Sequence, residues 1–188
     1  VEGEDVSLTA AIGVLGDTAI GSVDVTARND AFLRAVGDIS DSSVLAEGLA
    51  KFELFKIPAI GATPIPFGDM NNNTVTAGGI EIDGLVNLEN GSYLTKAGAL
   101  TVDADGKIEG ATFTSETANV ELNADEEIVN VKVAAETDAT LEAAEIGGGF
   151  VTAETGKASL EAGAIGGMTV IAGNAIDDQV HSVGHLAT

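Results

Sequence analysis

Four segments in the second half of the chain share one pattern: TVDADGKIEGATFT (101–114), ELNADEEIVNVKVA (121–134), TLEAAEIGGGFVT (140–152) and SLEAGAIGGMTVIA (159–172). Two columns of aliphatic residues at equivalent positions align the copies, namely Val102, Leu122, Leu141 and Leu160, and Ile108, Ile128, Ile146 and Ile165. The segments between the copies also repeat, as SETAN (115–119), AETDA (135–139) and AETGK (153–157). A period near 19 residues is shorter than those of tetratricopeptide and ankyrin units and lies in the range of solenoid coils and hairpin arrays.

Apolar and polar residues alternate within each copy, as at Val120, Leu122 and Ala124. This period of two is typical of a β-strand and not of a helix. Each copy is therefore predicted to contain a strand, a tight turn, a second strand and a corner. Two arrangements satisfy this pattern, a β-solenoid with one coil per copy or consecutive hairpins of a sandwich or barrel. The small interior residues favour the solenoid, and in either case the predicted fold class is all-β.

The first half of the chain shows no such period. Residues 1–28 alternate as strands do, whereas Ser42 followed by Glu47 and Lys51 predicts the start of a short helix within residues 42–51. The segment FELFKI (52–57) predicts a buried strand. We therefore expect a compact, sandwich- or barrel-like β-domain at 1–98, a repetitive β-region at 99–174 and a C-terminal tail at 175–188.

Charge and composition exclude several classes of function. The 188 residues carry 30 acidic and 8 basic side chains, a formal net charge of −22, and no cysteine. Binding to nucleic acid or to an anionic membrane surface depends on clustered Lys and Arg, so neither partner is expected. Membrane insertion is not expected either, because the uncharged stretch at residues 162–176 is shorter than the ~20 residues needed to span a bilayer. Disulfides and thiol chemistry are excluded. Aromatic residues make up 4% of the chain, which disfavours an enzyme pocket.

The motifs that carry catalytic or cofactor chemistry are absent from the sequence. It has no nucleophile elbow, phosphate-binding loop or dinucleotide-binding turn. Asp103, Asp105 and Gly106 form a DADG step, but the residue six positions beyond the glycine is Thr112 and not the Glu of a calcium-binding loop. A tight turn explains this step, and a Ca²⁺ ion held by Asp103 and Asp105 is the alternative. We expect no other cofactor and no enzymatic activity.

A family resemblance lies in residues 46–76. Gly48, Phe52, Leu54 and Lys56, followed by Gly68, Asp69, Val75 and Thr76, resemble a pattern in the capsid-decoration, head-fibre-like proteins of tailed phages. The resemblance implies a small β-domain that trimerises on a capsid.

These observations together predict a non-enzymatic structural subunit that self-assembles, most simply a virion capsid or capsid-decoration protein, located in the virion or outside the cell. Its partners would be further copies of itself and other capsid proteins. The expected assembly contacts are Phe52, Leu54, Phe55, Leu122, Leu141 and Leu160. Two alternatives stay open: an extracellular filament, pilus-like or surface-layer subunit that polymerises through β-strands, and a secreted glycan-binding module or enzyme.

Overall fold

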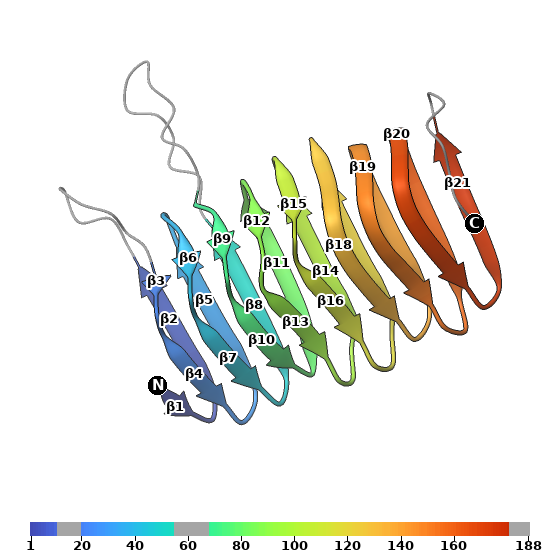
Figure 1. Ribbon diagram of the computed structural model, residues 1–188. Coiled ribbons are helices and arrows are strands. Elements are labelled where there is room, and N and C mark those ends of the chain that lie inside the picture. The colour runs from blue at the N-terminus through green and yellow to red at the C-terminus, as the bar shows by residue number, and fades with distance from the viewer. Residues whose placement is uncertain (11–19, 55–67, 181–188) are drawn as a thin grey trace, which may run out of the picture.

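The chain folds as a parallel β-solenoid of about eight turns, each of roughly 19 residues (Figure 1). The computed structural model describes residues 1–10, 20–54 and 68–180. The coils stack side by side from the N-terminal coil to the C-terminal coil, and the corners that join one coil to the next run along one edge of the stack (Figure 1). All strand pairs are parallel, for example β14 with β17 and β19 with β20. The solenoid prediction is therefore confirmed, because hairpins would pair antiparallel strands.

Each coil contributes to three parallel ladders. The first, which we call the acidic face, consists of β2 (Val6–Ala10), β5 (Ala31–Ala35), β8 (Leu49–Leu54), β11 (Gly79–Leu85), β14 (Leu100–Ala104), β17 (Val120–Ala124), the first parts of β19 (Ala139–Ala153) and β20 (Lys157–Ala172), and β21 (Ala175–Val180). The second, which we call the narrow face, consists of β3 (Ile20–Gly21), β6 (Ile39–Ser40), β9 (Met70–Asn71), β12 (Leu88–Glu89), β15 (Lys107–Glu109) and parts of β18 (Glu127–Ala135), β19 and β20.

The third ladder, which we call the threonine face, begins with β1 (Glu2–Gly3) and continues through β4 (Asp24–Ala27), β7 (Ser43–Ala46), β10 (Thr74–Ala77), β13 (Ser92–Thr95), β16 (Thr112–Ser115) and the last parts of β18, β19 and β20. From β4 to β20 its outward residues form two columns: Asp24, Ser43, Thr74, Ser92, Thr112, Lys132, Phe150 and Thr169, and Thr26, Leu45, Thr76, Leu94, Thr114, Ala134, Thr152 and Ile171. Serine and threonine occupy nine of these sixteen positions.

The two aliphatic columns of the sequence are stacked inside the solenoid. Leu122 pairs with Leu141 and Leu141 with Leu160, while the isoleucine column occupies the narrow face in the same register. These side chains are fully buried, at 0–1% exposure. The core is a narrow apolar stack that includes Tyr93 and Phe113, both fully buried, whose rings stack at 5.3 Å between centroids. In-register stacking of like aliphatic residues thus forms a continuous core.

The same solenoid includes the first half of the chain, where a compact, sandwich- or barrel-like β-domain was expected. The ladders cross the expected boundary at residue 98 without a break, since β11 pairs with β14 and β13 with β16. Six residues of the expected tail form β21, which pairs with β20. Residues 42–51 form strands and not the start of a helix. Val44, Ala46, Ala50 and Phe52 alternate into the core there, and burial of this face overrides the helical cap and charge spacing.

Left-handed backbone defines the corner between the narrow and threonine faces. One column of residues has positive φ at this corner: Ser22, Asp41, Asn72, Asn90, Gly110, Asn130, Gly148 and Gly167. Asparagine and glycine tolerate this conformation better than other residues. The amide oxygen of Asn130 fills the space where a side chain on Gly148 would lie, since a Cβ built there would be 2.6 Å from Oδ1. Each corner therefore restricts the residue that can follow it in the next coil.

At the corner between the acidic and narrow faces, side-chain oxygens of one coil accept hydrogen bonds from backbone N–H groups of the next coil. Asp38 Oδ1 accepts the Asp69 N–H at 2.9 Å, and Asp69 Oδ1 accepts the Asn87 N–H at 3.0 Å. Asn87 Oδ1 in turn accepts the Lys107 N–H at 3.0 Å. These bonds satisfy backbone donors where the chain turns out of the ladder.

Substitution of Asn130, whose φ is +55°, tests the corner conformation. Asn130→Val should lower the free energy of unfolding by about 1–2 kcal/mol, because a β-branched residue is strongly disfavoured at positive φ. Asn130→Gly should leave stability within about 0.5 kcal/mol of the native chain. Urea-unfolding midpoints followed by circular dichroism measure both, and equal stability of the two variants would contradict the left-handed corner.

Candidate functional site: the acidic face

Carboxylates dominate the outward side of the acidic face. Its outward side chains are Ser7, Phe32, Lys51, Glu81, Thr101, Glu121, Thr140, Ser159 and Asp177 in one column and Thr9, Arg34, Glu53, Asp83, Asp103, Asn123, Glu142 and Glu161 in the other. Eight of these are acidic and two, Arg34 and Lys51, are basic. Neighbouring strands lie about 4.8 Å apart, so the carboxylates of successive coils are held close to one another.

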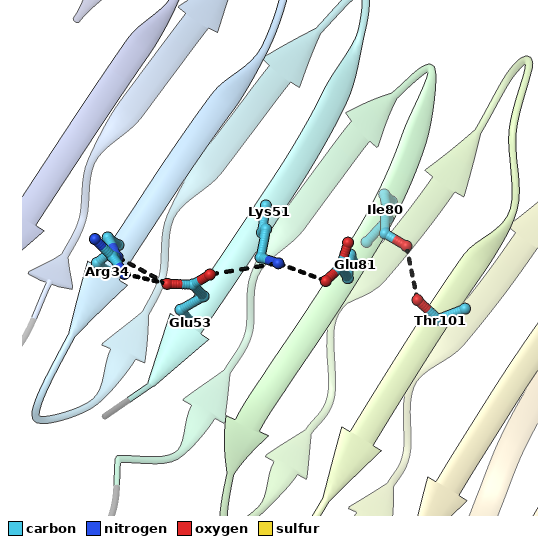
Figure 2. A network of polar contacts seen from close by, with 6 residues as sticks. All are labelled: Arg34, Lys51, Glu53, Ile80, Glu81 and Thr101. Atoms are coloured by element: carbon cyan, nitrogen blue, oxygen red, sulfur yellow. Dashed lines mark hydrogen bonds and ion pairs between the residues drawn. The ribbon is translucent and has the colours of Figure 1, made fainter. Parts of the chain in front are cut away.

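A chain of ion pairs connects the first coils of this face (Figure 2). Arg34 Nη2 lies 2.6 Å from Glu53 Oε2, and Arg34 Nε donates to the same oxygen at 2.7 Å. Lys51 Nζ lies 3.3 Å from Glu53 Oε1 and 2.6 Å from Glu81 Oε1. The four side chains come from β5, β8 and β11, so the network joins three consecutive coils from outside the core.

The network shifts the pKa values of Lys51 and Glu53. The hydrogen bond to Glu81 raises the pKa of Lys51, and the contact with Glu53 adds to this effect. Partial burial works to raise the pKa of Glu53, but the hydrogen bonds from Arg34 and Lys51 outweigh it and hold that pKa below its ordinary value. Both side chains therefore stay charged near neutral pH, and the first coils of the acidic face are locally neutralised.

Beyond β11 the outward basic side chain of the acidic face, among the described residues, is Lys157 at the start of β20, whose Nζ lies 2.7 Å from Asp177 Oδ2. Asp83, Asp103 and Glu121 line a shallow hollow of about 260 Å³ together with Glu81 and Asn123. At Asp83 and Gly84 the ladder carries a bulge, since Ile82 pairs with Val102 but Leu85 pairs with Ala104. The extra residue adds Asp83 to the carboxylates near Asp103, so charge is concentrated at this point of the face.

Asp103 is the carboxylate most affected by this arrangement. Partial burial raises its pKa, and the charges of Asp83, Asp105, Asp125 and Glu121 raise it further. A second hollow of about 310 Å³, lined in part by Asp125, Glu142 and Glu161, lies over the following coils. The acidic field therefore extends across the C-terminal half of the face, and such a field attracts cations.

The two residues expected to bind Ca²⁺ lie in different elements. Asp103 lies on β14 and faces outward, whereas Asp105 lies in the turn between β14 and β15. The described residues contain no group of three or more His, Cys, Asp or Glu side chains arranged to hold a metal ion. Calcium binding by Asp103 and Asp105 stays a prediction, and the hollow at Glu81, Asp83 and Glu121 is the environment in which Asp103 would act.

The residues expected to make assembly contacts lie inside the solenoid. Phe52, Leu122 and Leu141 are fully buried, Leu160 is 1% exposed and Leu54 is 4% exposed, while Phe55 lies outside the described residues. Their side chains pack against other coils of the same chain and are not available to another molecule. The repeat in the sequence identified the inner columns, because apolar residues recur there most regularly. The outer columns vary in residue type, and only their excess of Asp and Glu was visible.

Comparisons with family models, curated protein sequences and solved structures gave no match to this chain. In the described part of the chain, no helix is long and apolar enough to cross a membrane.

Removal of the Asp103 charge should stabilise the protein at neutral pH. The folded state raises the pKa of this carboxyl above its ordinary value of 3.8, so between the two values the folded chain binds more protons than the unfolded chain. Stability therefore falls as pH rises through that window, and Asp103→Asn should recover up to about 1 kcal/mol at pH 7.

The gain from Asp103→Asn should disappear below about pH 3.8, where the native carboxyl is protonated in both states. Thermal unfolding of both chains at a series of pH values measures the difference. Glu142→Gln, which removes one charge elsewhere on the same face, is the matched control. A gain from Asp103→Asn that is independent of pH would contradict the electrostatic explanation.

Proposed function

We propose that this chain is a non-enzymatic structural subunit whose copies join end to end through the open edges of the solenoid. The capsid or decoration layer of a virion is the assembly that we infer, as the sequence predicted. An extracellular filament or surface layer is the alternative, since it would use the same edges. One observation carries the proposal: the three parallel ladders have a free strand edge at each end within the described residues.

The N-terminal edge is a row of unpaired backbone groups. Within the described residues β2 pairs only with β5, and the Val6 N–H donates to Asp30 O at 3.0 Å on that side. Successive residues of a strand point their backbone groups in opposite directions, so the N–H groups of Ser7 and Thr9 point away from β5. Exposed donors of this kind bind an additional strand.

The C-terminal edge offers the complementary surface. Among the described residues β21 pairs only with β20. All ladders are parallel, so a second copy placed by translation along the solenoid axis sets its β2 beside β21 in the same strand direction. Contacts of this head-to-tail type do not close on themselves and generate an open, repeating assembly. The geometry supports a filament or an extended layer more than a closed dimer.

The net charge of −22 opposes this assembly at low ionic strength. Salt shortens the range of the repulsion, from about 30 Å at 0.01 M to about 8 Å at physiological ionic strength. We therefore expect end-to-end growth to increase with salt concentration.

Proline at an outward edge donor tests the joint. Ser7→Pro removes one N–H that points away from β5 and leaves the β2–β5 bonds intact, so the fold is expected to persist. Light scattering at about 0.15 M salt should show polymers of the native chain and no polymers of Ser7→Pro. Ser7→Ala, which keeps the N–H, is the matched control and should polymerise as the native chain does.

Mixtures of native and Ser7→Pro chains test whether polymers grow in one direction. The Ser7→Pro chain keeps its C-terminal edge, so it can join the N-terminal edge of a growing polymer but cannot be extended further at its own N-terminal edge. A small fraction of Ser7→Pro in native protein should therefore shorten the polymers out of proportion to its amount. A native chain that stays monomeric at every salt concentration would refute the proposed function.

A further inference from the structure

The threonine face differs in charge from the rest of the molecule. Of the sixteen outward side chains between β4 and β20, only Asp24 and Lys132 are charged, and their charges cancel. The two outward columns of the acidic face carry eight acids against two bases over a similar number of positions. From β4 to β20 the threonine face is therefore a nearly neutral surface on a chain whose net charge is −22, and Glu2 on β1 adds one negative charge at its N-terminal end.

The same face carries exposed apolar side chains. Leu45 is 49% exposed, Phe150 is 41% exposed and Ile171 is 52% exposed, and all three belong to its outward columns. In-register parallel strands hold these residues in straight rows, and short Ser and Thr side chains fill the rows between them. A regular, uncharged surface of this kind is suited to packing against another sheet.

We infer that a second copy of this chain packs against the threonine face, with the two solenoids side by side and antiparallel. Two copies of so acidic a chain repel each other on most approaches, and the threonine face is where this repulsion is smallest. A symmetric dimer buries the same surface on both copies, which a neutral and self-similar face permits. This contact differs from the end-to-end joint and does not depend on it.

The two charges of the face fix the register of the pair. Asp24 and Lys132 lie in the same outward column, on the first and sixth strands of the face counted from β4. A two-fold axis along the strand direction, centred between β10 and β13, reverses the order of the strands and keeps the column. It sets Asp24 of each copy opposite Lys132 of the other, so two symmetric ion pairs form. In this register Leu45 on β7 lies within the contact, whereas Phe150 on β19 and Ile171 on β20 lie beyond its sixth strand.

The size of the contact predicts its strength. Six strands about 4.8 Å apart and four residues at about 3.3 Å each give an area of roughly 29 by 13 Å on each copy. The product, roughly 380 Å² on each copy, is about half the area that each partner buries in a stable specific interface, so the contact should be weak, with a dissociation constant on the order of 100 µM. The dimer should therefore form at high protein concentration, or within an assembly that repeats the contact.

Sedimentation equilibrium of the Ser7→Pro chain isolates this contact, because end-to-end joining is blocked in that background. Between about 10 µM and about 1 mM the chain should shift from monomer to dimer. Lys132→Glu should weaken the dimer about tenfold, because it places two like-charged pairs in the interface. Asp24→Lys should weaken it to a similar extent, and the double variant Asp24→Lys/Lys132→Glu should restore it to within a few-fold.

Lys107→Glu is the matched control. It makes the same change in net charge as Lys132→Glu, but Lys107 lies on β15 of the narrow face, where its ion pair with Glu127 is exposed. Its effect on dimerisation should be less than about threefold. A Ser7→Pro chain that stays monomeric up to about 1 mM would overturn the inference, and so would a double variant as weak as the single variants. Failure of native polymers to form would bear on the end-to-end proposal alone.

Discussion

In-register parallel pairing is the constraint on which the other features of this protein depend. Each residue lies about 4.8 Å from its equivalent in the next coil, so every position of the repeat becomes a column of stacked side chains. Inside the solenoid, Leu122 on Leu141 and Ile128 on Ile146 pack well because like aliphatic residues interdigitate. At the corner with positive φ, the column accepts mainly asparagine and glycine. The narrow core and the similar shape of successive coils both follow from this stacking.

Stacking is unfavourable for charges, and the acidic face shows how the chain limits that penalty. Two unit charges about 5 Å apart interact by roughly 1 kcal/mol in water and by about 3 kcal/mol in the lower effective dielectric near a protein surface. In the first coils Arg34 and Lys51 alternate with Glu53 and Glu81, so unlike charges are neighbours. In later coils neutral residues such as Thr101 and Asn123 separate some of the acids, while Glu142 pairs directly with Glu161. At Asp103, partial burial and the surrounding carboxylates together raise the pKa.

The sequence predicted the second half of the fold because its coils have nearly constant length. Leu122, Leu141 and Leu160 are spaced by 19 residues, and the structure pairs them in that register. In the first half, Val6 pairs with Ala31 and Leu49 pairs with Gly79, at spacings of 25 and 30 residues. The longer connections hid the period there, although the coils have the same design.

The candidate sites were harder to predict than the fold. The recurring leucines identified the core and not a contact surface, because burial within one chain and burial between chains select the same residue types. The outward columns vary in residue type from coil to coil, so their charge pattern becomes visible only when the register of the strands is known. The excess of acidic residues in the sequence indicated a repulsive surface but gave no sign that one face of the solenoid escapes it.

The distribution of charge along the acidic face also gives the solenoid a direction. Arg34 and Lys51 lie in the N-terminal coils, whereas the C-terminal coils carry Glu142, Glu161 and Asp177 against one basic side chain, Lys157, which pairs with Asp177. Joining two C-terminal edges would bring these acids against their own copies. A head-to-tail joint instead places Asp177 about two coils, or roughly 10 Å, and Glu161 about three coils from Arg34 of the next copy, so their attraction is partly screened in physiological salt. Joining like edges would pair the strands antiparallel, whereas the head-to-tail joint continues the parallel ladders, so ladder geometry and charge asymmetry together favour the head-to-tail arrangement over its reverse.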